Sequence, residues 1–322
     1  MCYSAMMEAD YATYVRHFGA EISFSEFAQF YWERETALGA MRTPRGMDRA
    51  FAAAKSAEGR TIKEAVDRHA QSQILSLSQE LQAQRDRLVE AEVKLARKVT
   101  KAASESRRIA SQKIARIKEQ IDDLLEDTPR PSDSRVFPRW FAPVLIWQNG
   151  KRTVVPMRYL CRPNGKPASV DDDFPATYNA RRDSLGRYWK DLFGHTHGVV
   201  LVHRFFENVH LHDAEQRPLA PGEKPRNVVI EFRPSTGEPM LAACLWSRWI
   251  NPDKNKPDLL SFALITDEPP ADIRARGHDR CIIPIREKYL DAWLNPQGDL
   301  AMSQQILRDR EPLYFEGRVV SD

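Results

Sequence analysis

The stretch PVLIWQNGKRTVVPMRY, residues 143–159, decides the fold class of this chain. Two runs rich in β-branched and aromatic residues, 143–148 and 151–159, are separated by Asn149 and Gly150, which favour a turn. Later runs have the same texture, with Pro, Gly or Asn between them: 198–206, 227–232, 240–246 and 260–266. Most are about ten to twenty residues apart, and that spacing favours a mostly antiparallel sheet or partly closed barrel over βαβ units.

Residues 60–128, upstream of all of these runs, contain neither Gly nor Pro and are rich in strong helix formers such as Ala, Glu, Lys and Leu. Apolar residues recur there at steps of three, four or seven, a stripe of coiled-coil width. A continuous helix would be roughly 100 Å long at about 1.5 Å per residue. We therefore expect it to fold back near residues 100–108, or else to pair with a partner chain such as a second copy. Thr61 with Glu64 predicts a capping box at its start, and Pro129 predicts its end.

These patterns predict an α+β fold: a mostly antiparallel sheet or partly closed barrel with flanking helices, interrupted by a long helical, coiled-coil-like insertion. Residues 285–295 predict one short surface helix. The composition, 42% hydrophobic and 29% charged in 322 residues, is typical of a soluble globular chain. No apolar run is as long as a membrane span, and the first residues do not read as a secretion signal. We expect a cytoplasmic protein.

The cysteines and histidines predict neither metal nor cofactor. Four scattered cysteines without a Cys-x-x-Cys pair argue against a zinc ribbon and fit a reducing compartment. Five histidines gather between residues 195 and 212, and a His-x-His spacing can ligate metal. No carboxylate or cysteine completes a persuasive ligand set with them.

The net charge of +3 conceals an uneven distribution. Between residues 94 and 118, within the predicted helix, nine basic residues are opposed by Glu105 alone. Such a surface can lie along nucleic acid phosphates, with an affinity that falls as salt rises, or it can be the solvated face of a coiled coil. The candidate DNA contacts in this stretch are Lys94, Arg97, Lys98 and Lys101.

Cys2 offers the most distinctive chemistry of the chain. Removal of Met1, which is plausible before a small residue, leaves one residue with both an α-amine and a thiol. The amine titrates at about pH 8, so a fraction of it is an uncharged nucleophile at neutral pH. It can form an imine with an aldehyde, and the thiol can then close a thiazolidine ring, a reaction that no internal cysteine can perform. On position alone, an incidental early cysteine is the simpler interpretation.

Downstream motifs follow the initial Met-Cys in a particular order. They are FPRWFAP (137–143), MRY (157–159), YNAR (178–181), VLV (200–202), FFE (205–207), ACLWSRW (243–249), HDR (278–280) and DAWL (291–294). Together they resemble the SRAP family, the SOS response-associated peptidase fold that binds abasic-site DNA. The resemblance covers the start of the chain and everything after about Val136. We therefore expect an SRAP-like domain made of residues 1–30 and 131–322, with residues 31–130 as a helical insertion.

The resemblance implies a role for each matching residue. Cys2 is the nucleophile that forms a thiazolidine with the ring-opened aldehyde of an abasic deoxyribose. Asn179 positions the Cys2 amine and the sugar, and Glu207 is the acid/base for ring opening and imine formation. His278 moves a proton to or from the sugar hydroxyl. A carboxylate and an imidazole can supply both kinds of proton transfer.

The resemblance also implies the partner. Arg181 engages a DNA phosphate as a bidentate cation, and Arg158 and Arg139 complete the DNA contacts of the sheet domain. The expected partner is single-stranded or junction DNA that contains abasic sites, in the DNA-damage response. A nucleoid-associated location and peptidase activity on the protein's own Met1 follow from the same resemblance.

The residues after Cys2 differ from the SRAP pattern, and two other functions therefore remain alternatives. Many SRAP members continue Met-Cys-Gly-Arg, whereas Tyr3 and Ser4 follow Cys2 here, so a basic DNA contact near the nucleophile is missing. Arg16 is the only arginine before residue 31. An N-terminal-nucleophile amidohydrolase, of the glutamine amidotransferase type, would use the Cys2 thiolate on an amide, although oxyanion-hole and glutamine-clamp motifs are not recognisable. A coiled-coil DNA- or protein-binding module with a degenerate site is the second alternative.

Overall fold

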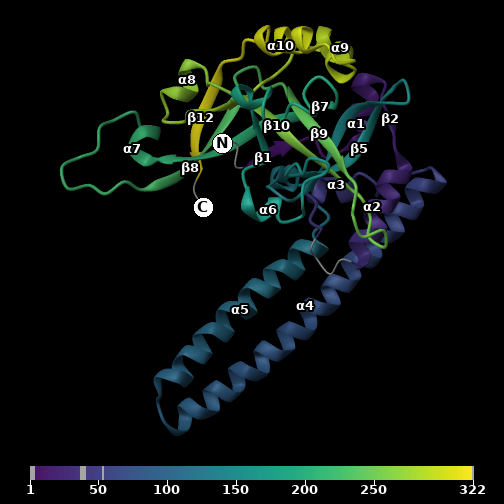
Figure 1. Ribbon diagram of the computed structural model, residues 1–322. Coiled ribbons are helices and arrows are strands. Elements are labelled where there is room, and N and C mark those ends of the chain that lie inside the picture. Colours follow the sequence, from purple (N-terminus) through teal and green to yellow (C-terminus); the bar gives the residue numbers. More distant parts are fainter. Residues whose placement is uncertain (1–3, 37–40, 53, 321–322) are drawn as a thin grey trace.

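The computed structural model of the chain describes residues 4–36, 41–52 and 54–320, which form a twelve-stranded sheet with helices and a long helical hairpin (Figure 1). The strands are β1 (Ser4–Met7), β2 (Glu21–Ile22), β3 (Arg135–Val136), β4 (Phe141–Gln148), β5 (Lys151–Tyr159), β6 (Asn179–Arg181), β7 (His197–His210), β8 (Asn227–Pro234), β9 (Met240–Trp249), β10 (Leu259–Asp267), β11 (Cys281–Ile282) and β12 (Phe315–Val320). The α-helices are α1 (Tyr11–Phe18), α2 (Phe24–Thr36), α3 (Arg45–Arg49), α4 (Ala57–Arg97), α5 (Lys101–Leu125), α6 (Val170–Asp173), α7 (Leu211–Ala214), α8 (Ala271–Arg274), α9 (Leu290–Leu294) and α10 (Leu300–Arg308). Short 3₁₀ turns lie at Pro131–Ser134, Arg182–Ser184 and Glu287–Tyr289.

The sheet is mixed and curls into a partial ring. Its main path runs β11-β10-β5-β4-β7-β1-β3. Because β9 pairs with both β10 and β7, the path β10-β5-β4-β7-β9 returns to its start. The β10–β5 and β4–β7 pairings are two residues long each, so the ring is not a continuous barrel. Most pairs are antiparallel, while β2–β5, β5–β10 and β6–β10 are parallel. The α+β class and the mostly antiparallel sheet are confirmed.

The turn between β4 and β5 forms where the sequence predicts it. Gln148 lies opposite Lys151, so Asn149 and Gly150 alone make the loop. Their φ angles of 51° and 79° lie in the left-handed region, as a type I′ turn requires at both central positions. The other predicted runs also form strands. Strand β7 is the longest of them and continues to His210, beyond the predicted run.

Side chains along each strand point alternately to the two faces of the sheet, so the core is divided into two apolar clusters. On β7, Val199 and Leu201 belong to one cluster, and Val200 and Val202 belong to the other. The first cluster includes side chains of α1, α2, α9 and α10, the helices that cover one face of the sheet. The second joins the opposite face to β1, β8 and α8. The predicted short surface helix forms as α9, which exposes Asp291 and Ala292 and buries Trp293 against β7.

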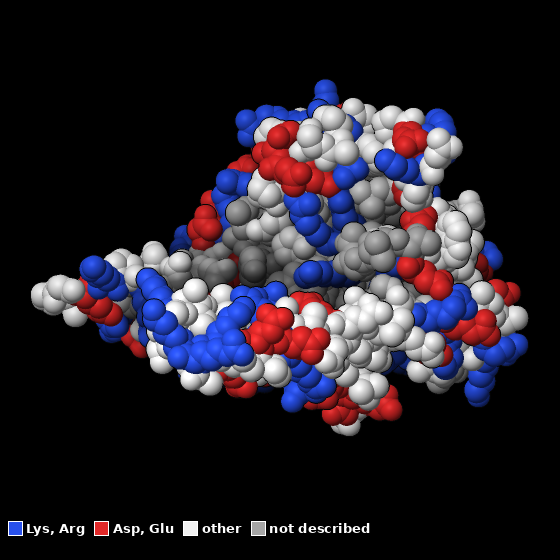
Figure 2. Space-filling view, turned by 90° about the horizontal axis from the view of Figure 1, so that it is seen from below, with Lys and Arg blue, Asp and Glu red and all other residues white. Residues whose placement is uncertain are grey.

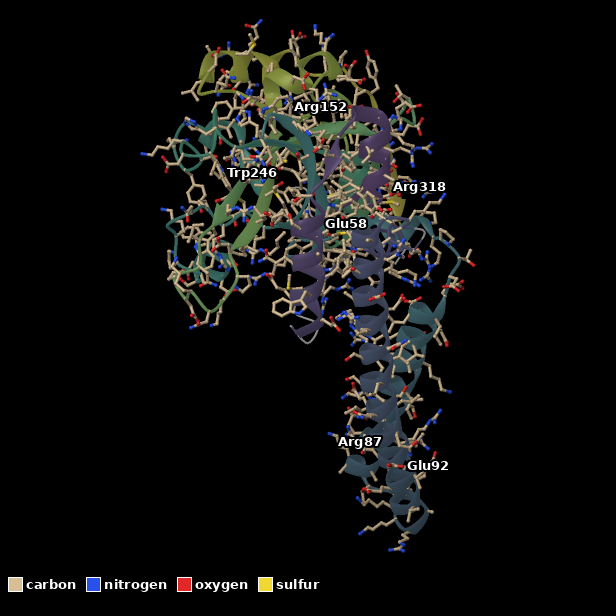
Figure 3. The ribbon with its side chains drawn as sticks, turned by 90° about the vertical axis from the view of Figure 1, so that its right-hand side faces the viewer. Glu58, Arg87, Glu92, Arg152, Trp246 and Arg318 are labelled. Carbon is tan, nitrogen blue, oxygen red and sulfur yellow. The ribbon has the colours of Figure 1, made fainter. Side chains whose placement is uncertain are left out.

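Helices α4 and α5 form the predicted long element as a hairpin that slants away beneath the sheet (Figure 1). The chain turns at residues 98–100, at the start of the predicted fold-back region. Ser56 caps α4 through the backbone N–H of Gly59, so the predicted capping box at Thr61 is wrong. Figure 3 shows Glu58 at the root of the hairpin and Arg87 and Glu92 far along it. Within the described ranges, neither this hairpin nor any other helix has the apolar length needed to cross a membrane.

Candidate active site and nucleic-acid interface

Glu207 and His278 form a buried pair at the centre of the candidate site. Glu207 lies on β7 with its side chain 2% exposed, and His278 follows α8 with its side chain 8% exposed. The His278 Nε2 atom is 3.2 Å from Glu207 Oε2. These two predicted site residues are far apart in the sequence, and the fold brings them into contact.

The second ring nitrogen of His278 fixes the orientation of the imidazole. Nδ1 is 2.8 Å from the carbonyl oxygen of Arg280 and 3.3 Å from the backbone nitrogen of the same residue, so its role depends on the tautomer. With the proton on Nδ1, the imidazole donates to that oxygen across the shorter contact. A proton between Nε2 and Glu207 Oε2 can then rest on either atom, as an imidazolium–carboxylate or an imidazole–carboxylic acid pair. Such a pair can accept a proton and return it, which is the requirement for general acid–base chemistry.

Gly277 determines where His278 lies. Its φ of +83° is in the left-handed region that favours glycine. A Cβ atom at this position would overlap the side chain of Asp213. Any other residue would therefore require a backbone shift directly beside His278.

Asn179 contributes an unusual buried amide. It lies on β6 opposite Leu264 of β10 and is 6% exposed. Within the part of the chain that the structure describes, neither its amide nitrogen nor its amide oxygen has a hydrogen-bond partner. Leaving such a group unsatisfied costs about 1–3 kcal/mol. Asn179 therefore makes no hydrogen bond to Glu207 or His278 and has both amide atoms available for a bound group.

Strand β1 carries the start of the chain to this region. Ser4 lies opposite Phe206 of β7, the residue before Glu207, and Ala5 lies opposite Phe205. Cys2, the predicted nucleophile, lies outside the described residues.

Arg135 was not predicted as a site residue. It lies on β3 opposite Met6, and its Nε atom donates to Ser4 Oγ at 3.1 Å. Its guanidinium carbon is 3.8 Å from the centre of the Phe206 ring, a cation–π geometry. A cation therefore lies beside β1, where the sequence lacks the arginine that many SRAP members carry. The pairing joins residues 131 positions apart, and no local motif signals it.

The sequence matches the family model described as SOS response associated peptidase (SRAP) over residues 100–322. The chain belongs to the SRAP family. Membership associates it with the response to DNA damage. The match contains Asn179, Glu207 and His278 but begins after Cys2.

Solved structures with related folds include two proteins from Bordetella bronchiseptica, one of them phage-related, and one from Bacteroides thetaiotaomicron. The first Bordetella protein is 16% identical, with a TM-score of 0.44 over 61% of this chain and 89% of its own. The Bacteroides protein is 15% identical, with a TM-score of 0.46 over 59% and 78%. The phage-related protein is 18% identical, with a TM-score of 0.43 over 59% and 82%. No curated protein matches the chain. The family assignment therefore rests on the family model.

The three arginines predicted to contact DNA from the SRAP sheet differ in exposure. Arg181 is half exposed and donates to Asp183 at 2.7 Å. Arg139 is also half exposed and donates to Asp172 at 2.6 Å. Arg158 is 12% exposed, and its Nη1 atom lies 2.7 Å from Asp171 Oδ2. A phosphate contact by Arg158 would first require this buried ion pair to open.

Four further predicted DNA contacts lie at the far end of the hairpin. Figure 2 shows Lys and Arg side chains gathered at the lower left, over this tip. Lys94, Arg97, Lys98 and Lys101 are all exposed. Lys94 is 3.8 Å from Glu90, and the other three form no ion pair with any described residue.

The described cysteines are poor nucleophiles. Cys161, Cys244 and Cys281 are buried and free. Burial raises the pKa of each thiol, that of Cys161 to about 12, so all three are protonated at neutral pH.

Among the described residues, no three His, Cys, Asp or Glu side chains gather as a metal site would require. His197, from the predicted histidine cluster, instead stacks on Trp293 with ring centres 3.9 Å apart.

Proposed function

We propose that this SRAP protein binds single-stranded or junction DNA and captures abasic sites covalently through Cys2, after removal of Met1. The observation that carries the proposal is the buried Glu207–His278 pair, whose Glu207 lies on β7, the strand that pairs with β1. Ser4 pairs with Phe206, and two residues of extended chain span at most about 7 Å. The α-amine and thiol of Cys2 are therefore within reach of β7 near Glu207.

The proposed reaction needs only proton transfers. The closed abasic sugar opens when its hydroxyl loses a proton and its ring oxygen gains one, which exposes the C1′ aldehyde. The Cys2 amine attacks C1′ to form a carbinolamine, and loss of water forms the imine. The thiol then adds to the same carbon, and its proton moves to nitrogen. One C–N and one C–S bond form, one water leaves, and no oxidant or reductant is needed.

Glu207 and His278 are the proton donor and acceptor in this scheme. The pair shares a proton that can move to the departing oxygen and be recovered from the attacking amine. Asn179 offers a buried amide that can accept from the sugar hydroxyl and donate to the sugar oxygen. The same acid–base pair, near residue 2, can also assist hydrolysis of the Met1–Cys2 bond, which consumes one water and frees the amine.

Phosphate binding is assigned to two half-exposed arginines, Arg181 and Arg139, and to the partly buried Arg135. Arg181 and Arg139 form ion pairs with the exposed carboxylates of Asp183 and Asp172, which phosphate can replace. Arg139 also donates to the backbone oxygen of Asp171 at 3.0 Å. Arg135 supplies the cation beside β1. Arg158 holds the fold through Asp171, so we leave it out of the DNA contacts.

The test is a denaturing gel of protein incubated with an abasic-site oligonucleotide. The wild-type protein should give a heat-stable adduct. Cys2→Ala keeps the α-amine but lacks the thiol, so its adduct should survive heating only after borohydride reduction of the imine. A Cys161→Ala protein is the matched control and should crosslink as the wild type does. A heat-stable adduct in Cys2→Ala would contradict the proposal, and glutamine hydrolysis without any adduct would favour the amidohydrolase alternative.

A further inference from the structure

The hairpin is anchored to the sheet domain through both of its legs. On α4, Ile62 and Ala65 are buried in the core, and Arg68 Nε donates to Glu35 of α2 at 2.6 Å. On the other leg, Arg45 and Arg49 of α3 both donate to the carbonyl oxygen of Glu126, at the end of α5. An arm held on both legs cannot swing about a single linker.

The two helices are also fastened to each other along their length. Ala91, Ala103, Ala110 and Ile117 are buried in the seam between them. Arg87 Nε donates to Ser106 Oγ across the seam at 3.0 Å. Three of these four are alanines, whose small side chains let the helices pack closely along the length of the arm.

The charge at the tip is only partly explained by helix stability. Lys94 and Arg97 lie in the last turn of α4, where a cation interacts favourably with the helix dipole. Lys101 is the first residue of α5, where the dipole disfavours a cation, and the first turn of α5 has no acidic residue. Lys98, the residue after α4, adds positive charge to the loop between the two helices. The tip therefore carries charge that its own folding opposes, which is expected where the charge serves to bind an anionic partner.

The position of the tip relates it to the candidate site. From Arg68, where α4 is tied to Glu35 of α2, to Arg97 at the tip, α4 extends about 40 Å at roughly 1.5 Å per residue. The α5 leg leads through Pro131–Ser134 into β3, which pairs with β1, so this leg connects directly to the strand that lies next to β1. In Figure 1 the tip lies beneath the side of the molecule that carries β1, α6 and β8.

We propose that the hairpin is a fixed spacer whose tip binds the phosphates of a DNA duplex flanking the abasic site, at a distance of about 40 Å or roughly twelve base pairs. The inference rests on the proposed function for its DNA partner. A rigid arm can select only a partner that is itself rigid over that distance. Duplex DNA is stiff over about 150 base pairs, whereas a flexible single strand would reach the tip from any spacing.

The test measures binding to abasic-site DNA in which the single-stranded segment is followed by a duplex of increasing length. Full-length Cys2→Ala protein is used, so that no stable crosslink forms. Affinity should rise at least tenfold once the duplex passes roughly twelve base pairs. The slope of the logarithm of the binding constant against the logarithm of the salt concentration should steepen by about 2. Lys98→Glu with Lys101→Glu should lose both the rise and the added slope. Lys254→Glu with Lys256→Glu, an exposed pair on the β9–β10 loop, is the matched control and should keep both.

The outcomes separate this inference from the crosslinking chemistry. Affinity that does not rise at this length, or a tip variant that keeps the rise, would overturn the spacer. A rise that depends on the tip would support it even if the wild-type protein formed no heat-stable adduct, and in that case the Cys2 chemistry would fail alone.

Discussion

Glu207 and His278 are both buried and at hydrogen-bond distance, and this contact places acid–base chemistry on two named atoms. Neither residue is distinctive by itself, because buried glutamates and loop histidines often have structural roles. The sequence indicated them only through their place in an ordered set of motifs. Their direct contact depends on the β7 register and on the turn before β11, which no local pattern encodes.

Glu207→Gln should slow adduct formation by about a hundredfold or more, because glutamine keeps the size of the side chain but cannot exchange a proton. The measurement is the single-turnover rate of adduct formation, with circular dichroism to show that the fold is kept. Glu231→Gln is the control, because Glu231 is a buried glutamate on the neighbouring strand that pairs with Arg204. A wild-type rate in Glu207→Gln would remove this residue from the mechanism.

Asp171 belongs to the fold rather than to the chemistry. Burial raises its pKa, but hydrogen bonds from Arg162 and Arg158 outweigh burial and hold the pKa below the ordinary 3.8. The carboxylate therefore stabilises the fold above that ordinary value, and the contribution disappears as the pH falls through the lower folded-state pKa. Asp171→Asn, which leaves two buried arginines without a counter-charge, should lower the free energy of unfolding by about 3 kcal/mol at neutral pH.

Urea unfolding at neutral pH and at about pH 3 measures this effect, and the gap between variant and wild type should narrow at the lower pH. Asp172→Asn is the matched control, because that side chain is 79% exposed in its pair with Arg139. It should change stability by less than about 1 kcal/mol. Equal effects of the two substitutions would contradict the buried ion pair.

At the scale of elements, the turn that carries His278 depends on Gly277. Gly277→Ala should destabilise the turn and slow adduct formation, because the new methyl group overlaps Asp213 and displaces His278. Gly165→Ala provides the control: its φ is +78°, but no atom lies within 4 Å of the added carbon. It should cost about 1 kcal/mol of stability and leave the rate unchanged. Equal rates in the two variants would show that His278 does not need this backbone.

The elements themselves could be predicted where their signals are local. Runs rich in β-branched and aromatic residues, with turn residues such as Asn149-Gly150 between them, predicted the strands. The stretch without Gly or Pro predicted the long helical element, either folded back or paired with another chain. Long-range pairing could not be predicted in the same way. The parallel pairing of β6 with β10, and the contact between Ser4 and Arg135, depend on tertiary packing. The start of α4 was misplaced because Ser56, four residues before the predicted start of the stretch, captures the first free N–H groups.

At the scale of the whole molecule, the two apolar clusters enclose every described cysteine. A thiol alkylating reagent should therefore modify Cys2 alone in the native protein and should abolish the heat-stable adduct. Cys161, Cys244 and Cys281 should react only after unfolding, because their thiols are buried and protonated. Peptide mapping by mass spectrometry reads out all four sites. Modification of Cys161 in the folded protein would contradict the described core.

Covalent capture requires the free amine of residue 2 to lie near the Glu207–His278 pair. Intact mass spectrometry of the adduct tests this most directly, in the wild type and in a protein with one alanine inserted between Met1 and Cys2. We predict a heat-stable wild-type adduct whose mass equals protein without Met1 plus abasic DNA minus one water. The insertion protein should give no heat-stable adduct, because its α-amine and thiol no longer belong to one residue. A heat-stable adduct of the insertion protein, or a wild-type adduct that retains Met1, would contradict this mechanism.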